Sequence, residues 1–316
     1  MSRRSHLAEP RVAASAVALV VVLATVVALL SPAPAATAGM RLHPQVGASA
    51  SSAREAARIR AYWTPERMRS TPPLQASGRS DPLAVASFAP VADASVAPYS
   101  VNGRIFVRQG RSKGYCSGTA INSPTRQLVL TAGHCVNTGP RGIRGTSAWS
   151  RYLEFVPAYA DGVAPFGSFV ALQAGVHALK PWVKEGNPNF DMGAAIVSPN
   201  AAGVNVADAV GGGATIAIDA GRQQSFQTFG YPGKVRRLQE CDSPITGEDQ
   251  LTRRIPGPPT VRIRCHWLPG ASGGGWLIEN GTVIDGLTSY GRNHDVAHTF
   301  GPYFSSENIG ELVAGF

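Results

Sequence analysis

The chain has 316 residues, of which 44% are hydrophobic and 16% charged, which is enough for one or two globular domains. Its 35 glycines and 24 prolines indicate many turns, a composition that favours short strands over long helices. The net charge of +9 is unevenly distributed, with ten basic and five acidic side chains in residues 1–98, and nineteen basic and fifteen acidic side chains in residues 99–316. No arginine cluster is interleaved with aromatic residues, so nucleic acid is not an expected partner.

Residues 1–38 have the pattern of a secretory signal peptide. Three arginines precede an apolar run from Val12 to Leu30, and Ala36-Thr37-Ala38 offers a small-residue cleavage site. At nineteen residues the run is longer than most signal-peptide cores, so an uncleaved membrane anchor is the alternative. The helix-breaking Ser31–Pro34 favours cleavage. We therefore expect a secreted, extracellular protein that meets a membrane only if this segment is retained.

Residues 39–98 differ in composition from the rest of the chain. They are rich in Ala, Ser, Pro and Arg and contain few strand-like runs. One short helix is expected at Ala53–Tyr62, before Pro65 ends it. A segment of this kind between a signal peptide and a compact domain is typical of a propeptide or a flexible linker, and we favour the propeptide.

From residue 99 to residue 316, short apolar runs alternate with turn residues, which predicts an all-β sandwich or barrel. A short C-terminal helix is expected at Glu307–Val313, and no repeat of fixed period is present. The expected strands are Val101–Val107, Thr119–Ile121, Leu128–Thr131, Tyr152–Val156, Phe166–Ala174, Ala194–Val197, Ala214–Ile218, Phe226–Gly230, Val261–Cys265, Gly275–Glu279 and Val283–Ser289.

Three local patterns in this region carry chemistry. The sequence TAGHC places His134 at the end of a strand, FDMGAAI places Asp191 at the entry to an apolar strand, and GASGG surrounds Ser272 with glycines. Each pattern alone has an ordinary structural explanation, such as an exposed histidine or a glycine-rich turn. Their occurrence together, in the order His, Asp, Ser, is much more specific and indicates nucleophilic catalysis by an activated serine.

With these motifs the chain resembles the trypsin-like (chymotrypsin-fold) serine peptidases, whose triad follows the same chain order, and not the α/β-hydrolases. The resemblance implies two six-stranded antiparallel β-barrels with the active site between them. It also implies a secreted serine endopeptidase that acts on protein or peptide substrates, works as a monomer and needs no cofactor or metal. Two further stretches, FGYPG from Phe229 and WSRYLEFVPAY from Trp149, are similar to the bacterial glutamyl-endopeptidase-like branch.

The resemblance also implies a role for each residue of the motifs. His134 is the general base and acid, Asp191 orients its ring, and Ser272 is the nucleophile that forms an acyl-enzyme. The backbone N–H groups of Gly270 and Ser272 form the oxyanion hole, where one donor is typically worth about 3 kcal/mol of transition-state stabilisation.

The sequence GLTSYG, which begins at Gly286, is similar to the substrate-binding strand of this family. By that match Ser289 supports the catalytic aspartate. Tyr290 and Gly291 then line the primary pocket and pair with the backbone of the substrate. An ordinary strand and turn is the alternative interpretation of this stretch.

The four cysteines lie at positions 116, 135, 241 and 265, and no CxxC pair suggests a zinc site. An even number in an exported chain favours disulfides, although the sequence permits three connectivities. The resemblance implies that Cys116 pairs with Cys135, closing the loop ahead of the catalytic histidine. That assignment leaves Cys241 and Cys265 as the second pair.

Two departures from trypsins concern activation and the oxyanion hole. Ala271 stands before the serine, where trypsins have an aspartate that pairs with a freed N-terminal amine. No Ile-Val-Gly-Gly start exists near residue 100 either. The sequence therefore predicts an activation that does not use amine insertion. Ala271 is also the best argument for the alternative function, a catalytically silent relative that binds peptides or a protein partner.

The residues of the specificity pocket leave two alternatives. His266 occupies the position six residues before the serine that resembles the pocket floor of trypsins, so a strict preference for Arg or Lys is not expected. Glutamyl endopeptidases carry a histidine where this chain has Thr288. Either His266 recognises an acidic side chain, or Trp267 narrows the pocket towards small residues.

Overall fold

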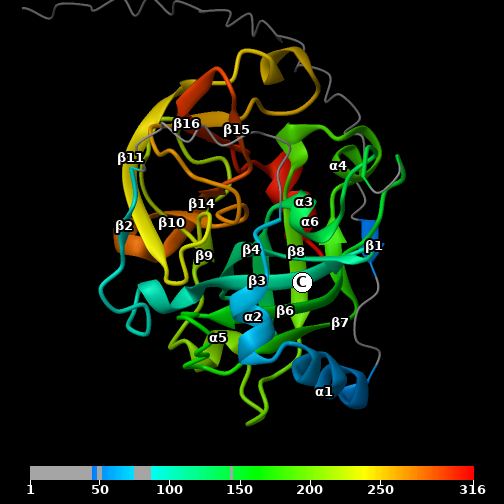
Figure 1. The fold of residues 1–316 in the computed structure, drawn as a ribbon. Helices are drawn as coiled ribbons and strands as arrows, with labels where there is room; N and C mark the ends of the chain where they lie inside the picture. Colours follow the sequence, from blue (N-terminus) through cyan, green and yellow to red (C-terminus); the bar gives the residue numbers. More distant parts are fainter. Residues whose placement is uncertain (1–44, 48–51, 75–86, 143–144) are drawn as a thin grey trace, which may run out of the picture. The chain divides into compact units, whose positions relative to one another are not determined.

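The computed structural model describes residues 45–47, 52–74, 87–142 and 145–316 (Figure 1). All of these belong to one structural unit, Arg41–Phe316. The apolar run Val12–Leu30 and the predicted cleavage site lie outside the described residues. Within the described ranges, no helix is both long enough and apolar enough to span a membrane.

Six antiparallel strands close into a first barrel, in the order β7-β6-β3-β4-β5-β8 with β7 also paired to β8. The short strand β1 adds to the outside of β7. Side chains such as Ile105, Val129 and Phe155 are fully buried and belong to the hydrophobic core. The strands are β1 (Gln45–Gly47), β3 (Asn102–Gln109), β4 (Ser112–Ile121), β5 (Leu128–Thr131), β6 (Arg151–Pro157), β7 (Phe169–Ala178) and β8 (Gly193–Val197).

A second sheet has the order β15-β16-β12-β11-β10-β13-β14-β9, with β2 paired to β11. Thr288 and Ser289 join β14 to β15, and these two strands lie towards opposite ends of the sheet, where they pair with β13 and β16. This one run of chain therefore connects the two ends of the second sheet, which forms the second barrel of the fold. The strands are β2 (Ala89–Pro90), β9 (Thr215–Ile216), β10 (Ser225–Gly230), β11 (Gln239–Glu248), β12 (Val261–Ile263), β13 (Gly275–Ile278), β14 (Val283–Leu287), β15 (Tyr290–Arg292) and β16 (Asp295–Gly301).

The two-barrel fold predicted from the sequence is thus confirmed. Most predicted strand bounds differ by a few residues, but β4 begins at Ser112, well before the predicted Thr119. The sequence does not predict β11 or β16, because both contain many polar residues and lack a continuous apolar run. They are strands because β10 and β12 pair with them along the backbone, and backbone pairing does not depend on side-chain polarity.

The helices are short and lie around the barrels. Helix α1 has the predicted bounds, and the predicted C-terminal helix is present as a π-turn at Ser306–Gly310 followed by α6. The helices are α1 (Ala53–Tyr62), α2 (Pro65–Ser70), α3 (Gly133–Val136), α4 (Lys180–Glu185), α5 (Val206–Ala209) and α6 (Glu311–Val313), and 3₁₀ turns occur at Tyr99–Val101, Pro188–Phe190, Thr252–Arg254 and Glu279–Gly281.

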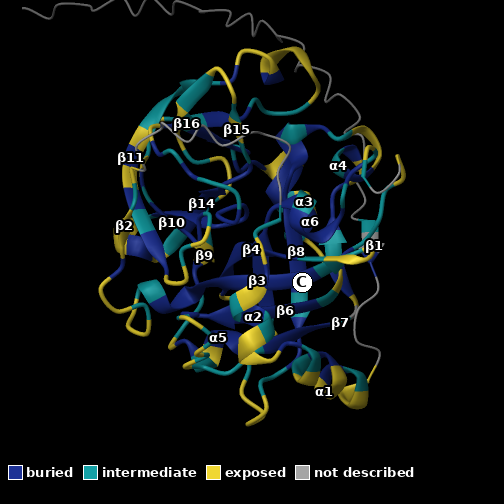
Figure 2. Cartoon of the chain, in the orientation of Figure 1, coloured by how far each residue is buried: buried dark blue, intermediate teal, exposed yellow. Residues whose placement is uncertain are grey.

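Helices α1 and α2 pack on the outside of the first barrel and leave one face in solvent (Figure 2). Ile59, Trp63 and Met68 are buried in this contact. The indole N–H of Trp63 donates to the carbonyl of Tyr152 over 2.7 Å, and its ring centroid lies 5.4 Å from that of Phe106. These residues ahead of position 99 therefore pack against the barrel core.

Glu154 on β6 is a buried carboxyl group in the first barrel. It is 1% exposed, and its Oε2 atom has no hydrogen-bond partner among the described residues. Burial raises the pKa of Glu154 to about 7, against smaller lowering effects of Ser168 and Arg60. The folded chain therefore keeps a proton that the unfolded chain releases above its ordinary pKa of 4.5.

This raised pKa predicts a pH-dependent stability. The stabilising contribution of protonated Glu154 to the folded state is fully present below about pH 4.5. It is lost as the pH rises through 7, because between these two values only the unfolded chain ionises freely. Relative to Glu154→Gln, the free energy of unfolding of the natural chain should fall by roughly 3 kcal/mol over this range. Urea unfolding at a series of pH values measures it, with the exposed Glu66→Gln as control. Parallel curves for the natural chain and Glu154→Gln would contradict the prediction.

Candidate active site

The pairing of β5 with β8 brings His134 and Asp191 together. Thr131 at the end of β5 lies opposite Gly193 at the start of β8. His134 follows that end and Asp191 precedes that start, so the two side chains meet at one edge of the barrel. Nδ1 of His134 is 2.8 Å from Oδ2 of Asp191, and the backbone N–H of His134 donates to Oδ1 over 2.7 Å.

The carboxylate of Asp191 also receives a donor from the second barrel. The hydroxyl of Ser289, in the connection between β14 and β15, donates to Oδ2 over 2.5 Å. Asp191 is 2% exposed and Ser289 is 1% exposed. The carboxylate is thus buried but accepts three hydrogen bonds, which is the arrangement that a buried charge requires.

Asn189 holds the turn that presents this carboxylate. The side chain is fully buried and donates to the carbonyls of Thr252 and Pro256 at 3.1 and 3.0 Å. The 3₁₀ turn Pro188–Phe190 is thereby attached to a loop of the second barrel. Sequence reasoning did not single out Asn189, although its position two residues before Asp191 is the one available signal.

Ser272 lies in the loop before β13 and contacts β4 through its backbone. The N–H of Ser117 donates to the carbonyl of Ser272 over 2.8 Å. The neighbouring Cys116 forms a disulfide with Cys135, the residue after His134. Two adjacent residues of β4 therefore hold the serine loop and the histidine helix. The second predicted disulfide, Cys241–Cys265, is also present, so both pairings are confirmed.

The ring of His134 has one nitrogen that is not engaged. Nε2 is buried and has no hydrogen-bond partner among the described residues, and Ser272 is 4% exposed. No hydrogen bond joins the hydroxyl of Ser272 to Nε2 within the part of the chain that the structure describes. Catalytic hydrogen bonds of this kind are often long before a substrate is bound and tighten in the complex.

Gly270 and Gly273 shape the serine loop. At Gly270 φ is +100°, and a Cβ atom there would lie 2.6 Å from both the ring of Tyr115 and the carbonyl oxygen of Tyr231. At Gly273 φ is +80°, and a Cβ atom would lie 2.1 Å from Oγ1 of Thr131. Only glycine is compatible with both positions. The N–H groups of Gly270 and Ser272 donate to no backbone carbonyl of the described residues.

Tyr290, predicted to line the primary pocket, is engaged by a polar cluster. Its hydroxyl donates to Oδ2 of Asp249 over 2.6 Å and lies 2.8 Å from Oγ1 of Thr260. Burial raises the pKa of Tyr290, and the hydrogen bond to Asp249 adds to the effect. At Asp249 burial opposes ionisation, but donors including Tyr290 and Arg292 outweigh it and lower the pKa. Gly291 is exposed beside this cluster.

His266 and Trp267 have different surroundings from each other. Nδ1 of His266 contacts the carbonyl of Val296 and therefore carries the proton, while Nε2 is buried without a partner among the described residues. A neutral His266 thus presents an acceptor at Nε2. Trp267 packs in the interior of the second barrel, stacked on Phe88 at 5.2 Å, and donates to Thr228 over 3.1 Å.

Arg104 on β3 is a buried cation that sequence reasoning missed. It is 2% exposed, and its guanidinium lies 4.0 Å from the ring centroid of Tyr115, 4.5 Å from that of Tyr159 and 4.8 Å from that of Tyr231. Burial lowers the pKa of Arg104, while the tyrosines oppose this. The aromatic faces therefore stabilise the charge by cation–π contacts beneath the serine loop. The signal was an arginine inside the apolar stretch GRIFV.

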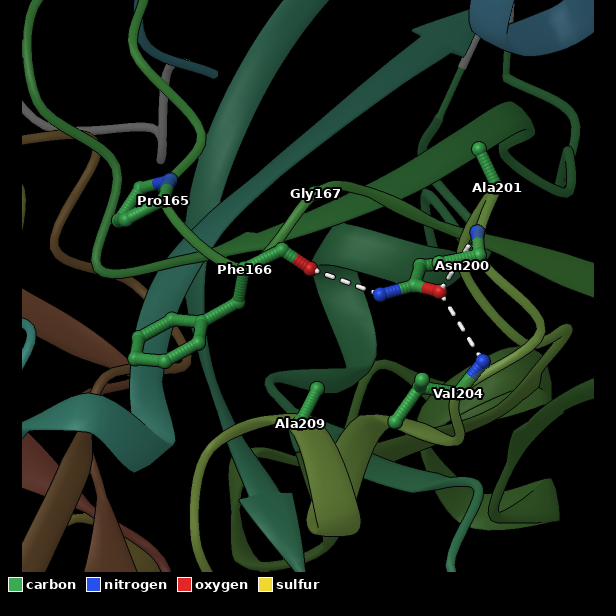
Figure 3. A pocket seen from close by; sticks show the side chains of 8 residues that line it. Pro165, Phe166, Gly167, Asn200, Ala201, Val204 and Ala209 are labelled. Atoms are coloured by element: carbon green, nitrogen blue, oxygen red, sulfur yellow. Dashed lines mark hydrogen bonds between the residues drawn. The ribbon is translucent and has the colours of Figure 1, made fainter.

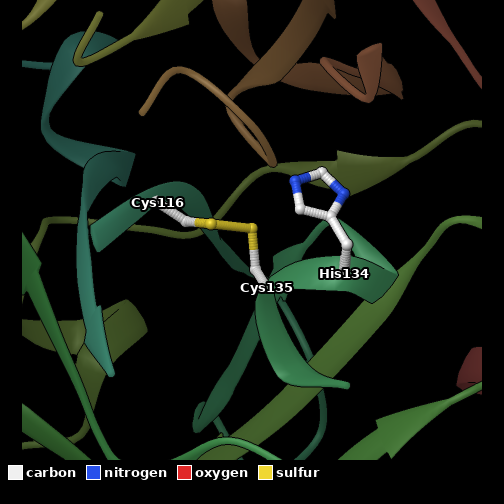
Figure 4. Close-up of side chains that lie close together, drawn as sticks. All are labelled: Cys116, His134 and Cys135. Atoms are coloured by element: carbon white, nitrogen blue, oxygen red, sulfur yellow. A yellow bond between two sulfur atoms is a disulfide. The ribbon is translucent and has the colours of Figure 1, made fainter. Parts of the chain in front are cut away.

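Two other features of the described residues offer neither a metal site nor a second reactive site. Cys116, His134 and Cys135 place possible ligand atoms within 4.8 Å, but the two sulfurs are bonded to each other and cannot act as thiolate ligands (Figure 4). A shallow groove of about 420 Å³ lies on the first barrel, where Asn200 bonds to the carbonyl of Phe166 and to the N–H of Val204 (Figure 3). Its lining contains no nucleophilic or ionisable side chain.

Solved structures with a similar fold are proteases. A thermostable serine protease AL20 from an extremophilic microorganism is 27% identical, with a TM-score of 0.59 over 68% of this chain and 96% of that chain. The protease Anisep from Arthrobacter nicotinovorans is 30% identical, with a TM-score of 0.56 over 65% and 90%. A Glu endopeptidase is 20% identical, with a TM-score of 0.57 over 72% and 95%, and shows likeness of fold alone. No family model and no curated protein matches the chain.

Proposed function

The chain belongs to the trypsin-like serine proteases of the chymotrypsin fold and hydrolyses peptide bonds, and we propose that His134, Asp191 and Ser272 are its catalytic triad. The observation that carries the proposal is the contact of Asp191 with both the ring and the backbone of His134. The disulfide Cys116–Cys135 and the bond from Ser117 to Ser272 hold the nucleophile's loop next to this pair.

The proposed mechanism follows from these contacts. Ser272 Oγ attacks the scissile carbonyl while its proton passes to Nε2 of His134. Asp191 fixes the tautomer with a proton on Nδ1 and stabilises the imidazolium that forms. The N–H groups of Gly270 and Ser272 bind the oxyanion. His134 then gives its proton to the leaving amine, and water releases the acyl group by the same steps in reverse order.

The chain is proposed to act outside the cell. The signal-like residues 1–38 support export, and two disulfides are expected in an oxidising compartment. Retention of Val12–Leu30 as an anchor is the alternative. Cell fractionation distinguishes the two, because a cleaved chain is recovered from the medium and an anchored chain from the membrane fraction.

Labelling with a fluorophosphonate and cleavage of casein test the triad. The processed protein should label and cleave, and Ser272→Ala should lose both activities, with kcat lower by at least about 10⁴-fold because only binding and oxyanion contacts remain. Ser123→Ala, a hydroxyl deletion elsewhere in the first barrel, is the matched control and should behave like the unchanged protein.

Two results would count against this proposal. Labelling that persists in Ser272→Ala places the nucleophile elsewhere. Absence of labelling in the folded, processed natural chain removes the catalytic proposal and favours the silent, peptide-binding relative.

Residues 39–98 are proposed to form a propeptide that covers the edge of the active site. The N–H of Tyr115 donates to the carbonyl of Pro72 over 3.1 Å, and the N–H of Leu74 donates to the carbonyl of Tyr115 over 2.8 Å. Pro73 lies close to Gly270, because a Cβ atom added to Gly270 would be 3.1 Å from the Cβ atom of Pro73. Residues 72–74 therefore lie along the part of β4 before Thr119, which β5 leaves unpaired and at which an extended peptide next to the serine loop would pair.

The comparisons are compatible with a removable segment. The similar structures cover 65% to 72% of this chain but 90% to 96% of their own length. The share of this chain that is covered is close to the share made up by residues 99–316. The helices α1 and α2 anchor the segment through Ile59, Trp63 and Met68, so removal requires cleavage after the anchor and its dissociation.

This arrangement predicts a latent precursor. The intact chain should label with the fluorophosphonate at least about tenfold more slowly than the processed protein. Trp63→Ala removes the buried anchor, which typically costs 3–5 kcal/mol, and should raise the labelling rate of the uncut chain. Arg58→Ala, an exposed position on α1, is the control. Equal labelling rates of intact and processed protein would contradict a covering role.

A further inference from the structure

The serine loop lacks a charged side chain that could fix its conformation. Ala271, next to Ser272, has only a methyl side chain and is fully buried. It packs against Gly230, and a Cβ atom added to Gly230 would lie 2.9 Å from the Cβ atom of Ala271. The two N–H groups proposed to bind the oxyanion belong to this loop. Their directions must therefore be set by other hydrogen bonds.

Three successive peptide groups of the loop have bonded carbonyls. The carbonyl of Pro269 accepts from the N–H of Gly233 over 2.7 Å. The carbonyl of Gly270 accepts from the hydroxyl of Ser117 over 2.9 Å, and the carbonyl of Ala271 accepts from the N–H of Gly274 over 2.9 Å. In a trans peptide the N–H points opposite to its carbonyl. The N–H groups of Gly270 and Ser272 thus point away from the bonds that Gly233 and Gly274 make. The bond from Ser117 fixes the peptide between them, whose N–H, that of Ala271, donates to the carbonyl of Leu268 over 3.2 Å.

Ser117 is the residue that makes two of the contacts to this loop. Its N–H bonds to the carbonyl of Ser272, and its hydroxyl bonds to the carbonyl of Gly270. The same hydroxyl accepts from the N–H of Tyr231 over 3.0 Å, so its single proton is directed to Gly270. Ser117 is 1% exposed, and water cannot replace these bonds without opening the site.

Tyr115 supports the other side of the loop. Its hydroxyl donates to the carbonyl of Gly233, whose N–H in turn holds Pro269. The residue is 2% exposed, and its ring lies over the guanidinium of Arg104. Two residues of β4, Tyr115 and Ser117, therefore hold the loop in place through hydrogen bonds.

We propose that Ser117 is a positioning residue. It fixes the peptide between Gly270 and Ala271, and thereby keeps the N–H groups on either side of that peptide, those of Gly270 and Ser272, in the orientation for oxyanion binding. The proposal rests on the proposed function of this site. Because none of these hydrogen bonds comes from an amine, the oxyanion hole is ordered without a freed N-terminus. It follows that the oxyanion hole is already ordered in the precursor, and that removal of the propeptide only makes it accessible to substrate.

Kinetics of processed variants test the proposal. Ser117→Ala should lower kcat by about 10- to 100-fold and leave KM within about twofold, because oxyanion binding acts in the transition state. The inhibition constant of a peptide boronate, whose tetrahedral adduct uses the same donors, should rise by a similar factor. Ser117→Thr keeps the hydroxyl and should retain most of kcat.

Thr119→Val is the matched control. Thr119 is a fully buried hydroxyl of the same strand; it bonds to Asn102 and, among the described residues, makes no hydrogen bond to the serine loop. Its loss should lower the melting temperature as much as Ser117→Ala does, without the effect on kcat. If both variants lower kcat equally, or Ser117→Ala leaves kcat unchanged, the positioning role is wrong.

Amine blocking gives a second measurement that needs no variant. Acetylation of the amino groups of the processed protein should leave kcat within about twofold, because no amine orders the loop. A loss of kcat on acetylation would overturn the proposal. These outcomes differ from failure of the proposed function itself, in which the unmodified natural protein would neither label nor cleave.

Discussion

The active site depends on one short stretch of β4, residues 115–117. Cys116 ties this strand to the helix that carries His134, and Ser117 ties it to the loop that carries Ser272. Tyr115 uses its hydroxyl to support the same loop and its backbone to hold Pro72 and Leu74. A strand of the first barrel therefore sets the position of groups from the second, and a shift of β4 would displace Ser272, His134 and the N–H group of Gly270 together.

The carboxylate of Asp191 is the second constraint between the barrels. A buried charge is tolerated only when its oxygens are hydrogen-bonded, and here the donors come from both barrels: His134 from the first and Ser289 from the second. Such donors resist rotation of the carboxylate away from the imidazole. Orientation of the base and packing of the two barrels are thus parts of one arrangement.

The sequence predicts the fold and the residues of the site because their signals are local. TAGHC and GASGG depend on glycine conformations and on a strand end that a few consecutive residues encode. The strands β11 and β16 were not predicted, since their stability comes from backbone pairing and not from apolar runs.

The role of Ser117 was out of reach for a different reason. Its hydroxyl bonds to a carbonyl 153 residues further along the chain, and nothing in CSGTA reveals that partner. The cation–π contacts of Arg104 with Tyr159 and Tyr231 are equally non-local. The sequence showed only that Ala271 cannot hold the loop by charge, and the structure supplies the contacts that take its place.

The most direct test of this account is an experimental structure of the processed protein with a peptide boronate bound. We expect a bond from boron to Ser272 Oγ, with one boronate oxygen about 3 Å from the N–H groups of both Gly270 and Ser272. The hydroxyl of Ser117 should still donate to the carbonyl of Gly270. An adduct on another residue, or an oxygen turned into solvent with the Gly270 peptide rotated, would contradict the account.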